Sequence, residues 1–542
     1  MSVLSKLIQK YFRELCDFQP LWAASLGLAE YAPLVVDLSS VRISAHLQEL
    51  RAIQKALQNI PPPSVWNEDR IEWELLQSDL RLRLKEWGEW KKYRQDPCLY
   101  VSEWTYGLWY LLLRFPEKDF RVDAALRRLQ ASRSVLEAAK LHLENPPKLW
   151  TKLAIQESEG YLVFLGEVRA ELLRNAPRRR AEIQAAIREA ESVAREFLRF
   201  LRGPLGRRST GDYAVGRKNF DFLLRHYHRY SLNAAQIREL GKKQFKAIQE
   251  QLVEQARMLD SRQAWHRLVE TAKRRHPKQG DLLAAYRQES KALRAFIQKQ
   301  GLVSLPPDES LEVIATPAFA RNTVPFAAYV DPPMFHGANH GTFFVTPVTE
   351  KRAKQAEALL QEHNFPSLRV TALHEGYPGH HLQFALQRHA SGTMMKIFNC
   401  SSFFEGWALY CEELMYEAAY YDGWGRLIQL KDKLWRACRV IVDVGLHTGE
   451  MTDAEAVRFM ARELKMSPLS ARADVNWYTQ RPTVPQGYLT GMLRLRELRA
   501  KEQKKKGVHF SLQNFHDAVL KHGAIPIPLV EKALEEVKRE RA

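Results

Sequence analysis

The spacing of apolar residues over the first 300 positions limits the fold more than any other feature of the sequence. In stretches such as DRIEWELLQSDLRLRLKEWGEWKKY and RAEIQAAIREAESVAREFLRFLRG, apolar side chains recur at intervals of three and four residues, which is the pattern of amphipathic α-helices. Proline and glycine interrupt this pattern, and we expect turns between helices there, at Pro61–Pro63, Asn145–Pro147, Gly203–Pro204 and Pro306–Pro307. Residues 1–300 are therefore predicted to form a helical scaffold subdomain.

The pattern changes between residues 311 and 349, where β-branched and aromatic residues alternate with proline and glycine. This composition predicts a small β-sheet, with a strand at GTFFVTPV (341–348) whose edge could accept an extended peptide. Helical spacing returns after residue 365. We therefore expect a mainly α protein in which residues 301–542 form a second subdomain, containing the sheet and further helices, as one continuous unit with the first.

Composition and charge exclude several classes of protein. No apolar run reaches the roughly 18 residues of a membrane span, and the N-terminus lacks the apolar core of a secretory signal, so a cytoplasmic protein is expected. The five cysteines are odd in number and lack C-x-x-C spacing, which favours reduced thiols. The net charge of +18 is spread over many helices. We interpret it as a solvated basic surface and do not expect nucleic acid or a membrane as partner.

The segment TALHEGYPGHHLQFALQRH (371–389) resembles a zinc-binding helix with one histidine displaced. In the H-E-x-x-H signature a second histidine follows the first by four residues, but that position holds Pro378. On an ideal helix His374 and His380 would project about 120° apart, and His374 and His381 would lie about 10 Å apart along the axis. Because Pro378 and Gly379 disfavour a regular helix, a broken turn could return either histidine to His374. The alternative is that the histidines are structural.

A candidate third ligand lies in SSFFEGWALYCEELMYE (401–417), a strongly helical segment. Glu405 and Glu412 are seven residues apart and share one face. Two histidines and a glutamate from a second helix form a common ligand set of zinc hydrolases, which keep one position open for water. Glu405 is the expected ligand. Glu412 would orient a ligand histidine, or it is a solvated charge.

A third segment, RVIVDVGLH (439–447), places Arg439, Asp443 and His447 on one helical face. This face could contribute to a catalytic site, with Arg439 receiving a terminal carboxylate of a substrate. A structural network of ion pairs would explain the same spacing.

Together these motifs resemble the bacterial family of domain of unknown function 885, whose members are regarded as zinc peptidases. The resemblance rests on HEGYPGHHLQ (374–383), FEGWALYCEE (404–413), RVIVDVGLHTGEMTDAEA (439–456) and QPLWAASLGLAEY (19–31). The family is similar to helical gluzincin peptidases such as thimet oligopeptidase, carboxypeptidase Taq and dipeptidyl peptidase III. The resemblance implies a large helical metallopeptidase-like fold with a small sheet beside the active-site helices. It also implies that His380 is the second ligand, with His381 as the alternative.

The sequence departs from this family near residues 477–491. The family pattern R-Y-x-x-W-P-G-Q-A-x-x-Y-x-x-G is replaced by WYTQRPTVPQGYLTG, which keeps Tyr478, Pro482, Tyr488 and Gly491. Tyr488 could still donate a hydrogen bond to a developing oxyanion, whereas substrate preference could differ.

These observations predict a zinc-dependent peptidase that binds one Zn²⁺ per chain and hydrolyses peptides, with carboxypeptidase- or oligopeptidase-like action. The expected metal ligands are His374, His380 and Glu405. Glu375 is the expected general base, and Tyr488 or His447 would stabilise the oxyanion. Substrate binding is assigned to Arg439 and Tyr478, and the outer positions around the metal to Glu412 and Asp443. The alternatives are a non-catalytic basic binding protein that has kept the fold, and a metal-dependent amidase or esterase.

Overall fold

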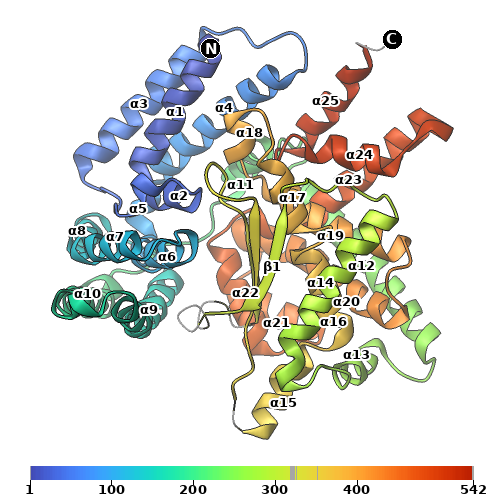
Figure 1. The fold of residues 1–542 in the computed structure, drawn as a ribbon. Coiled ribbons are helices and arrows are strands. Elements are labelled where there is room, and N and C mark those ends of the chain that lie inside the picture. The colour runs from blue at the N-terminus through green and yellow to red at the C-terminus, as the bar shows by residue number, and fades with distance from the viewer. Residues whose placement is uncertain (1, 318–320, 322–323, 325, 351, 540–542) are drawn as a thin grey trace.

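The computed structural model describes residues 2–317, 321, 324, 326–350 and 352–539. The protein is mainly helical, with one small sheet near its centre (Figure 1). Among the described residues, none of the helices combines the length and the apolar character that a membrane crossing requires.

The first 300 residues form a succession of helices, as the apolar spacing predicted. Their bounds are α1 (Val3–Phe18), α2 (Pro20–Ser25), α3 (Ser40–Gln58), α4 (Glu68–Arg83), α5 (Lys92–Gln95), α6 (Cys98–Arg114), α7 (Lys118–Gln130), α8 (Ser132–His142), α9 (Lys148–Asn175), α10 (Arg180–Phe200), α11 (Arg217–His226), α12 (Ala234–Leu259), α13 (Trp265–Lys273) and α14 (Leu282–Lys299). Side chains cap several of these helices. Ser2 accepts a hydrogen bond from the amide of Ser5, and Asn233 forms a capping box with Gln236.

One expected turn differs. The chain does not turn at Gly203–Pro204, because α10 continues into a short π-helical stretch, Leu201–Leu205, that contains the proline. A π-bulge leaves backbone groups without their usual partners, so it tolerates a residue that lacks an N–H group.

The sheet contains β1 (Ser310–Ala315), β2 (Ala327–Val330) and β3 (His340–Val345) in the order β1-β3-β2. Strand β3 pairs with β1 in parallel and with β2 in antiparallel orientation. The strand predicted at 341–348 is therefore the central one and ends at Val345. Because both its edges are paired, the prediction that its edge accepts a peptide is wrong. In the described part of the chain, the unpaired edges belong to β1 and β2.

Helices again follow the sheet. Their bounds are α15 (Ala353–Glu362), α16 (Phe365–Glu375), α17 (His380–Gln387), α18 (Thr393–Ile397), α19 (Ser401–Glu417), α20 (Gly423–His447), α21 (Asp453–Leu464), α22 (Pro468–Thr479), α23 (Val484–Lys506), α24 (Leu512–Leu520) and α25 (Ile527–Arg539). Helices α14, α16, α19 and α20 gather on one side of the sheet, and the group α6–α10 lies on the other side (Figure 1).

The buried apolar residues form two large cores, whose division differs from the expected boundary at residue 300. One core joins the N-terminal helices α1, α3 and α4 to α11–α14 and to the helices after the sheet. The other is built mainly from α6–α10. The first N-terminal helices therefore pack with the C-terminal half of the chain.

Candidate metal centre

The helix that carries the histidine motif is broken where the sequence predicted a break. Helix α16 ends at Glu375, and α17 begins at His380. The amide of Gly379 turns back to the carbonyl of Leu373, at 3.0 Å. A Cβ atom at position 379 would lie 2.0 Å from the carbonyl oxygen of His374. Only glycine fits this turn, because the close atom belongs to the backbone and cannot move aside.

This break brings His374 and His380 together with Glu405 from α19. One ligand atom from each of the three side chains lies within 4.8 Å of the others. The Nε2 atoms of His374 and His380 are 3.8 Å and 3.3 Å from Oε2 of Glu405. Both histidines are 8% exposed. The three residues selected from the sequence as metal ligands therefore share one largely buried position.

The donor set fits a metal ion. Oε2 of Glu405 is buried and has no hydrogen-bond partner in the described part of the protein, although it faces two imidazoles. Burial raises the pKa of the Glu405 carboxyl, but the neighbouring imidazoles of His374 and His380 outweigh burial and hold this pKa well below its usual range. A charged carboxylate with an unused oxygen beside two imidazole nitrogens is the environment that a divalent cation completes.

Glu412 fixes the orientation of His374. Its carboxylate is fully buried and lies 2.8 Å from Nδ1 of the imidazole. The proton of a neutral His374 is therefore assigned to Nδ1, which leaves Nε2 as the ligand atom. Burial alone would lower the pKa of His374, but the carboxylates of Glu405 and Glu412 raise it to about 10. A metal ion would have to displace the second proton of the imidazolium, the one on Nε2.

His381 points to a different set of partners. Its Nε2 atom lies 2.8 Å from Oε2 of Glu309, and its Nδ1 atom lies 3.2 Å from the hydroxyl of Tyr329 on β2. Both ring nitrogens are engaged, so the arrangement favours His380 over His381 as the candidate ligand.

Glu375, the expected base, is the last residue of α16 and is half-buried. Its side chain makes no hydrogen bond or ion pair with another residue that the structure describes. As the residue that follows His374, Glu375 lies directly beside a candidate ligand.

Tyr488 reaches the cluster from α23, and its hydroxyl donates to Oε1 of Glu405 at 2.6 Å. Two glycines allow this approach. A Cβ atom on Gly491 would lie 1.8 Å from the Ser402 carbonyl oxygen, and one on Gly406 would lie 2.7 Å from Gly491. Helices α19 and α23 therefore cross with their backbones in contact, and this crossing sets the distance between Glu405 and Tyr488.

Asp443 and His447 lie further along α20, away from the three ligand candidates. Asp443 accepts hydrogen bonds from the backbone amides of Thr483 and Gln486, both at 3.2 Å, where α23 begins. Nε2 of His447 lies 3.0 Å from the Tyr478 carbonyl oxygen. Within the described residues, neither side chain bonds to the cluster. Their contacts instead join α20 to the 478–486 segment.

Arg439 lies nearer the cluster. Its guanidinium is 4.6 Å from the ring centroid of Tyr488 and 4.3 Å from that of Trp435, and its Nε donates to the Tyr478 hydroxyl at 2.9 Å. The side chain is largely buried, and its Nη1 atom has no hydrogen-bond partner among the described residues. The Arg439 guanidinium thus packs against Tyr488, the side chain that donates to Glu405.

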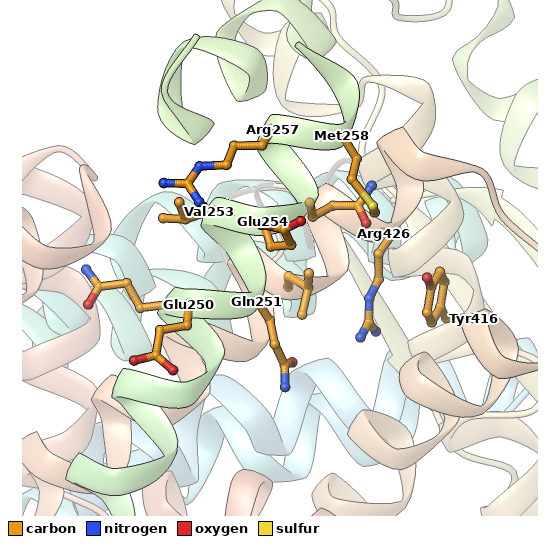
Figure 2. A pocket seen from close by; sticks show the side chains of 11 residues that line it. Glu250, Gln251, Val253, Glu254, Arg257, Met258, Tyr416 and Arg426 are labelled. Carbon is orange, nitrogen blue, oxygen red and sulfur yellow. Dashed lines mark ion pairs between the residues drawn. The ribbon is translucent and has the colours of Figure 1, made fainter. Parts of the chain in front are cut away.

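An open groove of about 760 Å³ lies elsewhere, between α12 and the helices α19 and α20 (Figure 2). Figure 2 shows Met258 and Arg426 on its walls, with Arg426 beside Tyr416, 3.9 Å from the ring centroid. Tyr416 lies eleven residues after Glu405 on α19, or about 16 Å along the axis. The groove contains none of the candidate site residues.

The sequence reasoning missed Glu309 and Tyr329, which contact His381. Glu309 lies in the loop PPDES before β1, and Tyr329 lies on a short strand. Neither position has a local pattern that separates it from an ordinary loop or strand residue, so only the tertiary structure could identify them.

Comparison with known proteins agrees with this architecture. A family profile described as bacterial protein of unknown function (DUF885) matches residues 20–534. No curated protein matches the sequence. The structure of a candidate lipoprotein of unknown function from Shewanella oneidensis is 20% identical, with a TM-score of 0.82 over 99% of this chain and 100% of that chain. A candidate lipoprotein from Colwellia psychrerythraea is 18% identical, with a TM-score of 0.82 over 100% of both chains. At these identities the likeness concerns the fold alone.

Proposed function

Because the chain belongs to the DUF885 family of bacterial proteins of unknown function, we infer its activity from its own residues. We propose that it is a zinc-dependent metallopeptidase that hydrolyses peptide bonds. The observation that carries the proposal is the meeting of His374, His380 and Glu405, with a buried carboxylate oxygen that has no partner among the described residues. Two imidazoles and one carboxylate suit zinc better than magnesium or calcium.

Each residue of the cluster then has a distinct task. His374, oriented by Glu412, His380 and Glu405 would hold the ion. A zinc ion with an open position activates a bound water and polarises a carbonyl group. Glu375, adjacent in sequence to a ligand and without a competing ion pair among the described residues, would take the proton of the attacking water and pass it to the leaving amine.

For the oxyanion we propose Tyr488 rather than His447. The Tyr488 hydroxyl is in contact with Glu405, whereas the imidazole of His447 is fully buried against the Tyr478 carbonyl. A phenol this close to the metal ligands could donate to the negative charge that develops on the carbonyl oxygen.

The substrate is proposed to be a peptide, bound by Arg439 and Tyr478 on one side and by the sheet on the other. The Nη1 atom of Arg439, which has no hydrogen-bond partner among the described residues, would donate to a carboxylate of the peptide. The unpaired edge of β2, which carries Tyr329, is the better candidate for pairing with an extended peptide backbone, because β3 is central.

Two measurements test this proposal. Elemental analysis after purification in zinc-supplemented medium should give about one zinc per chain. Mass spectrometry of a mixed peptide library should then show products that disappear with a chelator and return with zinc.

Absence of any transition metal would overturn the proposal. It would favour the basic binding protein, for which steeply salt-dependent nucleic-acid binding is the signature. Zinc without peptide products would direct the search to other amides and esters.

A further inference from the structure

We propose that Glu309 positions the metal centre, by clamping the segment between the two ligand histidines and by keeping His381 away from the ion. This inference rests on the proposed zinc site. Glu309 is a positioning residue, because it contacts neither the three ligand candidates nor Glu375 among the described residues.

The side chain of Glu309 is fully buried and accepts hydrogen bonds from three different elements. The Tyr377 hydroxyl donates to Oε2 at 2.5 Å, and Nε2 of His381 lies 2.8 Å from the same oxygen. Arg294 of α14 donates to Oε1 at 3.0 Å. A carboxylate is costly to bury unless such donors satisfy it. These donors make the anion a fixed point to which the surrounding segments are attached.

The two donors on the histidine motif bracket His380. Tyr377 lies in the break between α16 and α17, and His381 is the second residue of α17. Because the same oxygen holds residues 377 and 381, the backbone of His380 has little freedom to rotate or shift. The other side of the break is also held, since the indole of Trp407 on α19 donates to the carbonyl of Pro378 at 2.8 Å.

Glu309 also determines which of the two adjacent histidines can bind metal. With Nε2–H of His381 donating to Glu309, Nδ1 accepts from the Tyr329 hydroxyl, at 3.2 Å. A Cβ atom on Gly341 would lie 2.5 Å from Nδ1 of His381 and 2.8 Å from the Tyr329 hydroxyl. The absence of a side chain at Gly341 therefore makes room for this chain of hydrogen bonds. His381 has no nitrogen left for the ion, while Nε2 of His380 faces Glu405.

The test is the zinc affinity of Glu309→Gln, measured by competition with a chelator of known affinity. The glutamine keeps the shape but removes the charge and turns an N–H₂ group toward one of the donors. We expect zinc binding to weaken about 10- to 100-fold, the range typical of residues that orient metal ligands. The matched control is Asp308→Asn. Asp308 is the preceding residue, also bonded to a histidine, His389 at 2.9 Å, but half-exposed. The control should bind zinc like the wild type.

Thermal unfolding of the metal-free variants separates positioning from a general structural role. If Glu309→Gln lowers the melting temperature but the folded protein keeps wild-type zinc affinity, the inference is overturned. Should Glu309→Gln not fold, Tyr377→Phe removes one hydrogen bond of the clamp and retains the ring. It should weaken zinc binding by a smaller factor, and unchanged binding would contradict the proposal. If the wild type itself binds no zinc, the proposed function fails instead, so the two failures are distinguishable.

Discussion

Two glutamates of the candidate site differ in what their carboxylates contact. One oxygen of Glu405 accepts from Tyr488, and the other faces two imidazoles. The carboxylate of Glu375 has no hydrogen bond or ion pair with another described residue. The surroundings of Glu405 thus suit an anion that binds metal, whereas those of Glu375 leave its lone pairs available to accept a proton.

Substitution by glutamine should therefore separate the two roles. In Glu375→Gln we expect zinc and fold to be retained and hydrolysis to fall by about 10²- to 10⁴-fold, the usual contribution of a positioned base. In Glu405→Gln an anionic ligand becomes a neutral one, so zinc itself should weaken or be lost, together with activity. Zinc content and peptide turnover of both purified variants check this. If Glu375→Gln lost the metal and Glu405→Gln kept it, Glu375 would be the metal ligand and Glu405 the base.

Thr483 occupies an unfavourable backbone conformation. Its φ angle is +66°, and its hydroxyl is buried without a hydrogen-bond partner among the described residues. The family pattern R-Y-x-x-W-P-G-Q-A-x-x-Y-x-x-G has glycine at this position. Glycine adopts positive φ angles freely. A left-handed conformation costs a residue with a Cβ atom roughly 1–2 kcal/mol.

We expect Thr483→Gly to raise the free energy of unfolding by about 1 kcal/mol, after allowance for the flexibility of glycine in the unfolded chain. Urea denaturation measures it. Thr271→Gly in the last turn of α13 is the control and should destabilise the protein, since its backbone is helical. A loss of stability in Thr483→Gly would show that the threonine side chain contributes more packing than strain.

At the scale of elements, local patterns were sufficient where the cause of structure is local. Apolar spacing predicted the helices of the first 300 residues, and Pro378 with Gly379 predicted the break between α16 and α17. The π-helical stretch at Leu201–Leu205 and the order β1-β3-β2 were not predictable in this way. The strand order depends on pairing between segments distant in sequence, which a local pattern does not record, and no local signal in the sequence marked the π-helical stretch.

The crossing of α19 and α23 gives a test of how elements place the site. In Gly491→Ala the added Cβ atom would meet the backbone of Ser402, so the helices must separate. We expect a loss of about 1–3 kcal/mol in unfolding free energy, as for an overpacked core. The 2.6 Å hydrogen bond from Tyr488 to Glu405 should weaken, and zinc affinity should fall with it.

The control for this variant is Gly160→Ala in α9, where a Cβ atom would meet no atom within 4 Å. Alanine is the better helix former, so this change should stabilise the protein by up to about 1 kcal/mol. Urea denaturation and chelator competition on both variants decide the matter. Equal stability of the two would show that the glycine contact is not needed.

At the scale of the whole molecule, the residue types of the motifs selected His374, His380 and Glu405, which the structure brings together. Their binding of zinc stays a prediction. The clamp was beyond sequence reasoning, because Glu309 lies 72 residues before His381 and no local pattern marks it. The helices around α1 also pack into the core of the C-terminal half, which a boundary drawn from composition did not anticipate.

Buried neutral histidines connect the stability of the whole molecule to pH. Burial lowers the pKa of His228 to about 3 and the pKa values of His447, His516 and His522 to about 4, from an ordinary value of 6.5. As pH falls from 6.5 toward 4, the unfolded chain binds these protons and the folded protein does not. Each histidine therefore lowers the free energy of unfolding across that window, by up to about 1.4 kcal/mol per pH unit.

Other groups also titrate between pH 7 and 4. The contribution of one histidine is therefore measured as the difference in unfolding free energy between the wild type and a variant that lacks it. Burial raises the pKa of Glu103 and of Glu157 to about 7, and these carboxyls stabilise the folded form as pH falls, because it retains their protons. Nε2 of His522 is buried and has no hydrogen-bond partner among the described residues. The substitution His522→Leu should therefore remove one titrating group with little loss of folding stability. Urea denaturation at several pH values between 7 and 4.5 should show that the wild type loses stability relative to His522→Leu as pH falls through this range. Near pH 5 the wild type should take up about one more proton on unfolding than the variant. The slopes of unfolding free energy against pH should therefore differ by about 1.4 kcal/mol per pH unit. Parallel pH profiles would mean that His522 gains its proton without unfolding, and that its burial does not hold it neutral.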